Sequence, residues 1–160
     1  MVTGASGFIG YHLSQKLIDL GGQVFALSRN STKENIPDGC IPVSANIAHF
    51  EELKGSLSHI DPHFVFHLAG IVTTKADSSL ILPALHQNVL GTVNLLVSLL
   101  NSGCKRFVNV GTSEEVGKIS GYIKHISPYM ASKSAANLFV KLEFAIIKSA
   151  LFVLLITLLF

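Results

Sequence analysis

Short apolar runs alternate along this chain with longer stretches in which apolar residues recur every three or four positions. In residues 8–20 this period brings Ile9, Leu13 and Leu17 to one face, and Gly21-Gly22 then ends the stretch. Similar patterns predict helices over residues 49–58, 78–102 and 127–148. The apolar runs predict short strands over residues 23–27, 41–45, 64–68 and 106–110.

Strands that alternate with helices in this way imply right-handed crossovers and a parallel sheet. We therefore expect an α/β fold, a Rossmann-like doubly wound parallel sheet with helices on both faces. The length of 160 residues suits one domain, so residues 1–160 are interpreted as a single unit. Only Met1, Val2 and Thr3 remain for a first strand in the middle of the sheet, where a strand of about five residues is usual. We therefore expect the first strand to be truncated.

The last ten residues, LFVLLITLLF, contain one polar residue, Thr157. A membrane-spanning helix needs about 20 apolar residues, and the run stays short even when it is extended back to Phe144. A strand buried in a parallel sheet has a continuous apolar pattern of this kind. We favour the strand over the membrane span, and we expect a chain that ends on such a run to be a fragment.

Composition narrows the class of protein. Hydrophobic residues make up 49% of the chain and charged residues 14%, which argues against a disordered protein. The net charge of +2 comes from scattered basic residues, so neither nucleic acid nor a membrane is an expected partner. Cys40 and Cys104 are too few for a disulfide framework, and they favour buried thiols in a cytoplasmic protein. The spacing of the histidines predicts no metal site.

Three glycines stand three positions apart in the segment TGASGFIG, at Gly4, Gly7 and Gly10. In a dinucleotide-binding turn the first permits the tight turn from strand to helix, the second leaves room for a pyrophosphate, and the third lets the helix pack close to the sheet. The helix that begins near Phe8 then directs its free N–H groups at the phosphates. An ordinary glycine-rich turn is the alternative, but the helix and strand that follow favour dinucleotide binding.

The residues after the second predicted strand bear on the choice between NAD and NADP. A carboxylate at this place accepts a hydrogen bond from the ribose 2′-OH of NAD, but Ser28-Arg29-Asn30 contains no acid. The guanidinium of Arg29 can instead pair with a 2′-phosphate through a bidentate contact. We expect NADP or NAD as the cofactor and lean toward NADP. The alternative is that Arg29 is a solvated residue at a strand end.

Tyr129 and Lys133 form a YxxxK pattern at the start of the last predicted helix. The i, i+4 spacing places the phenol and the ammonium on one face, where the cation stabilises the phenolate. Tyr129 can then exchange a proton with a substrate alcohol or carbonyl, and Lys133 can hold the nicotinamide ribose. Thr112 follows a strand end, where ligands bind in open α/β sheets. It can donate a hydrogen bond to the reacting oxygen, and Glu114 is a candidate base. A plain polar turn would have the same composition.

With these residues the chain resembles the extended short-chain dehydrogenase/reductases, specifically the NAD-dependent epimerase/dehydratase family. The resemblance covers nearly the whole chain and rests on five motifs in the family's order: TGASGFIG, FVFHLAG, NVLGTVNLL, RFVNVGTSEEVG and SPYMASK. It implies a Rossmann-like domain and an enzyme that moves hydride between a nucleotide sugar and a nicotinamide cofactor while Tyr129 moves the proton. The implied catalytic residues are Thr112, Tyr129 and Lys133. The cofactor contacts expected from the motifs are Gly4, Ser6, Gly7, Phe8, Ile9, Gly10, Arg29, Asn46, Ile47, Leu68, Ala69, Gly70, Asn88, Tyr129 and Lys133.

Two of the departures from the family's pattern concern the cofactor and the catalytic residues. Asn46-Ile47 stands where the family has Asp-Leu or Asp-Val against the adenine, and an amide can serve there. Ser113-Glu114 stands where the dehydratases have an Asp-Glu pair. The family's C-terminal substrate domain is expected to be absent from these residues.

Other functions remain open. One is a catalytically incompetent remnant or a dinucleotide-binding module with this fold. Another is a reductase of a non-sugar carbonyl, such as a steroid or a flavonoid. For the oligomeric state, the resemblance implies a homodimer that pairs through the helix over residues 127–148.

Overall fold

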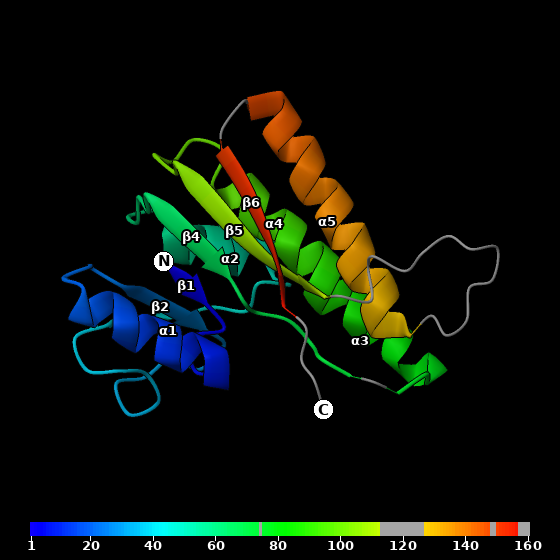
Figure 1. Ribbon diagram of the computed structural model, residues 1–160, viewed down its shortest axis with the longest axis horizontal. Coiled ribbons are helices and arrows are strands. Elements are labelled where there is room, and N and C mark those ends of the chain that lie inside the picture. Colours follow the sequence, from blue (N-terminus) through cyan, green and yellow to red (C-terminus); the bar gives the residue numbers. More distant parts are fainter. Residues whose placement is uncertain (74, 113–126, 148–149, 157–160) are drawn as a thin grey trace.

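The computed structural model describes residues 1–73, 75–112, 127–147 and 150–156. Six strands form one sheet in the middle of the molecule (Figure 1). The strands are β1 (Val2–Thr3), β2 (Phe25–Ser28), β3 (Ile41–Ser44), β4 (Phe64–His67), β5 (Arg106–Thr112) and β6 (Ala150–Ile156). Every neighbouring pair is parallel.

The strands lie in the order β3-β2-β1-β4-β5-β6, which is the order of doubly wound dinucleotide-binding sheets. Although β1 has only two residues, it lies at the centre, where Val2 pairs with Ala26 of β2 and with Phe66 of β4. The strand order reverses between β1 and β4, and ligands bind at the carboxyl ends of the strands at such a point. The topology therefore brings the glycine segment after β1 next to the loop after β4.

The helices cover both faces of the sheet (Figure 1). They are α1 (Phe8–Asp19), α2 (Phe50–Leu57), the 3₁₀ turn η1 (Ser78–Leu80), α3 (Ile81–Ala84), the π-helical turn η2 (Leu85–Leu90), α4 (Gly91–Ser98) and α5 (Pro128–Ile147).

Two apolar clusters hold these layers together. On one face, Leu13 and Leu17 of α1 pack against a small cluster that includes Ala26. On the other face, α2, α4 and α5 contribute to a larger cluster with Leu53, Leu95, Phe107 and Val140. Cys40 and Cys104 are free thiols that pack against these clusters. The sequence predicted buried thiols, but both side chains are only half-buried.

The expected α/β sheet with helices on both faces is confirmed, and most predicted ends agree with the structure within two residues. The helix predicted over residues 78–102 differs most. It ends at Ser98, begins as a 3₁₀ turn and contains the π turn of residues 85–90. A π turn adds one residue to a helix and shifts the faces on either side of it, so a regular apolar period does not reveal it.

The apolar run at the end of the chain forms a parallel strand. In β6, Ala150 pairs with Arg106 and Ile156 pairs with Thr112, so the strand lies along the full length of β5. The preference for a strand is therefore confirmed for residues 150–156, and residues 157–160 lie outside the described part.

Among the described residues, one helical segment of 21 residues, Ser78–Ser98, is long and apolar enough to cross a membrane by length and composition alone, and an 18-residue window within it has a mean hydropathy of 1.4. Because the core helix of a soluble protein meets the same criterion, this is weak evidence for a membrane span. Residues of this segment, such as Leu95, belong to the larger apolar cluster. The expectation of no membrane partner stays a prediction.

Candidate functional site

The segment between β1 and α1 is a tight turn that depends on glycine. Gly4 has a φ of +69°, in the left-handed region that favours glycine, and a Cβ there would lie 2.9 Å from the nitrogen of Ala69. A Cβ on Gly10 would lie 2.1 Å from the carbonyl oxygen of Gly4, so α1 begins directly against the turn. Gly7 is the N-cap of α1. The N–H groups of the first turn of a helix have no intrahelical acceptors, which makes this end suited to an anion.

Two cavities adjoin at this turn. One has a volume of about 400 Å³ and the other about 520 Å³. Both are lined by Gly4, Gly7, Leu68, Gly70 and Ile71. The first continues to the ends of β2 and β3 and is called the β2 cavity; the second continues to β5 and α5 and is called the α5 cavity. Together they follow the carboxyl edge of the sheet on both sides of the point where the strand order reverses.

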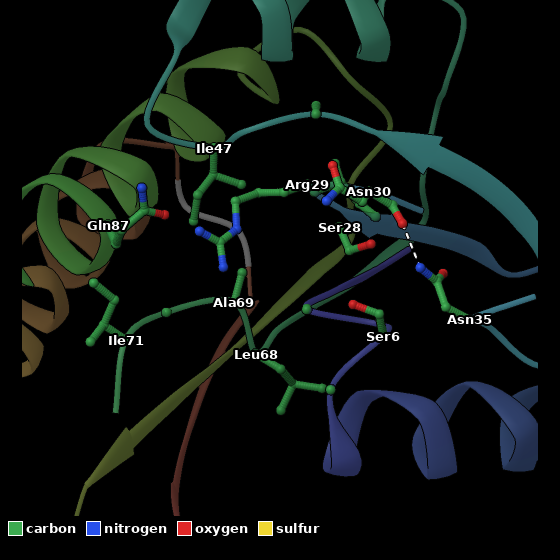
Figure 2. Close-up of a pocket in the computed structure, with 15 residues that line it drawn as sticks. Ser6, Ser28, Arg29, Asn30, Asn35, Ile47, Leu68, Ala69, Ile71 and Gln87 are labelled. Atoms are coloured by element: carbon green, nitrogen blue, oxygen red, sulfur yellow. Dashed lines mark hydrogen bonds between the residues drawn. The ribbon is translucent and has the colours of Figure 1, made fainter. Parts of the chain in front are cut away.

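The β2 cavity has a polar side formed by the chain after β2. Figure 2 shows the guanidinium of Arg29 extending into this cavity, and a hydrogen bond from Asn35 Nδ2 to the carbonyl oxygen of Asn30 beside it. The main chain of Arg29 is held from β3, because Ser44 Oγ donates to its carbonyl oxygen (2.9 Å). Ser31 Oγ, which is buried, donates to the carbonyl oxygen of Ala26 (2.7 Å) and folds the loop back over β2.

We expect Ser31→Ala to lower the free energy of unfolding by about 1–2 kcal/mol, because a buried carbonyl oxygen loses its donor. Urea denaturation measures this change. Ser58→Ala is the matched control, since Ser58 Oγ donates to Gly55 on the exposed surface, and its effect is expected to stay within about 0.5 kcal/mol. Equal losses in the two variants would contradict the anchoring role of Ser31.

The α5 cavity brings Tyr129 and Lys133 to the glycine turn. Both residues line it, together with Phe8 and Ile9 from the start of α1. The helix α5 begins within one residue of the predicted start: Pro128 is its first residue, and Ser127 Oγ accepts a hydrogen bond from the Met130 N–H (3.1 Å). This cap orients the first turn of α5, and therefore Tyr129, toward the cavity edge.

Most of the predicted site residues line one or both cavities. They are Gly4, Ser6, Gly7, Phe8, Ile9, Gly10, Arg29, Ile47, Leu68, Ala69, Gly70, Tyr129 and Lys133. Within the described part of the chain, Asn46, Asn88 and Thr112 line neither cavity. Thr112 is buried, and it follows Gly111, a residue that lines the α5 cavity. Glu114 lies outside the described residues. The roles of all these residues stay predictions.

The two asparagines make hydrogen bonds inside the protein. Asn46 Oδ1 accepts from the Ala48 N–H (3.1 Å). Asn88 lies behind the wall of the cavities, where its Oδ1 accepts from the Ile71 N–H (2.7 Å) and its Nδ2 donates to the Ile71 carbonyl oxygen (3.1 Å). Asn88 therefore acts on a cavity-lining loop rather than on the cavity itself.

Sequence reasoning missed several lining residues. Those of the β2 cavity are Leu27, Ser28, Asn30, Asn35, Ala45 and Gln87; Val72, Val110 and Gly111 line the α5 cavity, and Ile71 lines both. Most of them lie at or just after the carboxyl end of a strand, so the strand order was the available signal. No sequence signal marks Gln87, because its orientation depends on the π turn.

The residues present fit a dinucleotide. At the glycine turn the main chain carries no side chains at Gly4 and Gly10, where an added Cβ would collide with the protein. The turn lies between the β2 cavity, which has a polar side, and the α5 cavity, which contains Tyr129 and Lys133. Among the described residues, no group of three or more His, Cys, Asp or Glu side chains is placed to hold a metal ion.

Comparison with known proteins gives the same picture. The family model described as "NAD dependent epimerase/dehydratase family" matches residues 1–143. A sterol-4-alpha-carboxylate 3-dehydrogenase of Dictyostelium discoideum is 29% identical over 111 residues, which covers 68% of this chain and 32% of that protein. The chain thus spans about a third of this relative and about half of the solved structures that follow.

Two solved structures show how closely the fold agrees. The UDP-glucose 4-epimerase of Thermotoga maritima, determined with UDP-glucose, has a TM-score of 0.84 and 25% identity, and the match covers 96% of this chain and 53% of that one. The UDP-glucose 4-epimerase of Thermus thermophilus, determined with NAD, has a TM-score of 0.83, 25% identity and the same coverage. The order of the strands and the overall fold agree with this family match. The chain belongs to the NAD-dependent epimerase/dehydratase family.

Proposed function

We propose that this chain forms the cofactor-binding part of an NAD(P)-dependent epimerase, dehydratase or reductase that acts on a nucleotide sugar. The observation that supports the proposal best is the α5 cavity, which Gly7, Tyr129 and Lys133 line together. One cavity thus offers both an anion-binding helix end and a phenol that can move a proton.

Each part of the site has a role in this proposal. A bound nicotinamide dinucleotide supplies the hydride donor or acceptor. The main-chain N–H groups at the start of α1 hold its phosphates. Lys133 lies four positions after Tyr129 in α5, so its ammonium stabilises the phenolate and holds the ribose. Tyr129 Oη takes a proton from the substrate oxygen, or returns one to it, as the hydride moves, and Thr112 donates a hydrogen bond to the same oxygen.

Two substrate classes are supported by different relatives. A nucleotide sugar is favoured because the Thermotoga maritima epimerase was determined with UDP-glucose. A non-sugar carbonyl is the second candidate, favoured by the similarity to a sterol-4-alpha-carboxylate 3-dehydrogenase. Absorbance of the reduced nicotinamide, followed with a panel of UDP sugars and sterols, separates the two. Calorimetric titration with NAD and NADP tests the shared step, and absence of binding to both at millimolar concentration would refute the proposal.

The cofactor preference is tested at Arg29. If its guanidinium pairs with a 2′-phosphate, Arg29→Ala weakens NADP binding by about 10–100-fold, since hydrogen bonds to charged groups contribute about 1.5–3 kcal/mol. NAD has no 2′-phosphate, so its dissociation constant rises by less than about fivefold. Lys33→Ala is the matched control, because Lys33 is exposed in the same loop and does not line the β2 cavity. Equal weakening of NADP and NAD would contradict the preference for NADP.

A homodimer is also proposed. Exposed apolar side chains on α3 and α5 support it: Ile81 and Leu82 on α3, and Leu138, Phe139 and Leu142 on α5. Such side chains are typical of helix faces that pair with another subunit.

A further inference from the structure

A chain of buried side chains connects β1, β4 and the long helix behind the cavities. His67, the last residue of β4, has no exposed surface. Its Nδ1 lies 2.7 Å from Thr3 Oγ1 at the end of β1, and its Nε2 lies 2.9 Å from Thr92 Oγ1 in α4. In the sequence His67 falls within the strand predicted over residues 64–68, and the structure gives both of its ring nitrogens a partner.

The partners of the two threonines determine which ring nitrogen carries the proton. The Thr92 hydroxyl donates to the carbonyl oxygen of Asn88 (2.6 Å), so its one hydrogen is used and it accepts from His67 Nε2–H. Thr3 Oγ1 accepts from the N–H groups of Leu68 (3.2 Å) and Ala69 (3.1 Å). With both lone pairs occupied, the Thr3 hydroxyl donates its hydrogen to His67 Nδ1.

The same chain continues to the helix that carries Tyr129. Asn88 lies in the π turn, and its carbonyl oxygen accepts the hydrogen bond from the Thr92 hydroxyl. The side chain of Asn88 makes hydrogen bonds with both the N–H and the carbonyl oxygen of Ile71. Asn88 Nδ2 also donates to Ser132 Oγ (2.8 Å), and the Ser132 hydroxyl donates to the carbonyl oxygen of Tyr129 (2.8 Å). The loop of residues 68–71, which lines both cavities, is therefore fastened at both ends to one hydrogen-bonded network.

We propose that His67 is a positioning residue: as a neutral imidazole protonated at Nε2, it holds the cofactor-binding loop of residues 68–71 in register with the π turn at Asn88 and, through Ser132, with the first turn of α5. This inference rests on the proposed function for its benefit to catalysis, but the network itself does not depend on a cofactor. The π turn has a structural role in this network, because it places Asn88 between Ile71 and Ser132. Such turns recur at functional sites.

The surroundings of His67 keep it neutral. Burial, followed by the positive charge of Lys133 on α5, lowers the pKa of His67 to about 3. The aromatic ring of Phe107 on β5 lies beside it, with the ring centroids 5.8 Å apart. A proton on Nδ1 would also face a Thr3 oxygen that already accepts from two N–H groups, which disfavours the charged form on geometric grounds.

The first arm of the test needs no ligand and uses the full-length protein. In nitrogen-15 NMR spectra of the histidine rings, we expect His67 to show a protonated Nε2 and an unprotonated Nδ1 from pH 5 to pH 8. A protonated Nδ1, or protonation of both nitrogens in this range, would overturn the proposal.

Thr92→Val removes the hydroxyl that joins His67 to Asn88, whereas Thr92→Ser keeps it. We expect amide hydrogen exchange at Ile71 to accelerate about tenfold in Thr92→Val, the effect of one buried hydrogen bond, and to be restored in Thr92→Ser. Val65→Ala, which truncates a buried side chain in β4, the strand of His67, controls for lower global stability. Equal acceleration in Thr92→Val and Val65→Ala would show a merely structural role and overturn the proposal.

The third measurement is NAD binding, followed by calorimetry. We expect the dissociation constant to rise about tenfold in Thr92→Val and to return to the wild-type value in Thr92→Ser. An unchanged constant in Thr92→Val would overturn the positioning role while leaving the proposed function intact. If the wild-type protein binds neither NAD nor NADP, the proposed function fails, and the exchange rates at Ile71 still decide whether the network holds the loop.

Discussion

Tyr129→Phe is expected to lower kcat for hydride transfer by about 10²–10⁴-fold, which is the usual contribution of a general acid or base. The phenol hydroxyl is the group in the α5 cavity that we propose to exchange a proton with the substrate oxygen, and Phe keeps the ring but not this hydroxyl. Because we propose that the phosphates are held at the glycine turn, dinucleotide affinity is expected to change by less than about tenfold. Absorbance of the reduced nicotinamide measures the first quantity, and calorimetry measures the second.

Tyr11→Phe is the matched control for this experiment. Tyr11 is a partly exposed residue of α1 that lines neither cavity, so the same substitution there is expected to leave kcat unchanged. A Tyr129→Phe variant that keeps wild-type kcat would exclude Tyr129 as the proton donor or acceptor. A variant that loses cofactor affinity as strongly as kcat would assign Tyr129 a binding role instead.

Gly10→Ala is expected to have the largest effect on the fold at the site. Alanine is favoured over glycine inside a helix by about 1 kcal/mol, but a Cβ on Gly10 would lie 2.1 Å from the Gly4 carbonyl oxygen, far inside van der Waals contact. Neither atom belongs to a flexible side chain, so α1 must move away from the turn. We expect a net loss of about 2–3 kcal/mol or more in the free energy of unfolding. Because the proposed phosphate site is built from the same atoms, dinucleotide binding is expected to fall below detection.

Gly55→Ala separates helix propensity from this collision. Gly55 lies in α2, and a Cβ there would meet nothing within 4 Å. The substitution is therefore expected to be neutral or stabilising by up to about 1 kcal/mol. Thermal unfolding of both variants, with and without NAD, measures the difference. If Gly10→Ala proves as stable as Gly55→Ala and still binds the cofactor, the close approach of α1 to the turn has no functional importance.

Local features of the sequence determined which elements form. The start of α5 shows why: Ser and Pro are favoured residues at the beginning of a helix, and here Pro128 is the first residue of α5 while Ser127 Oγ accepts from the Met130 N–H. The left-handed turn at Gly4 and the helix stop at Gly21 are likewise properties of single residues, with φ of +69° and +80°. The family could be predicted for the same reason, because its motifs occur in order along the chain.

Only the tertiary structure decided how these elements meet. Arg29 extends into the β2 cavity because Ser31 and Ser44 hold the loop around it, and Asn88 turns away from the cavities because a π turn lies in its helix. His67 reads in the sequence as one more residue of an apolar strand, yet it joins Thr3 and Thr92 from two distant segments. Periodicity and caps depend on neighbours within a few positions, so a sequence reveals them directly. Hydrogen bonds between residues 25 or 64 positions apart depend on strand order and helix register, which only the packed molecule determines.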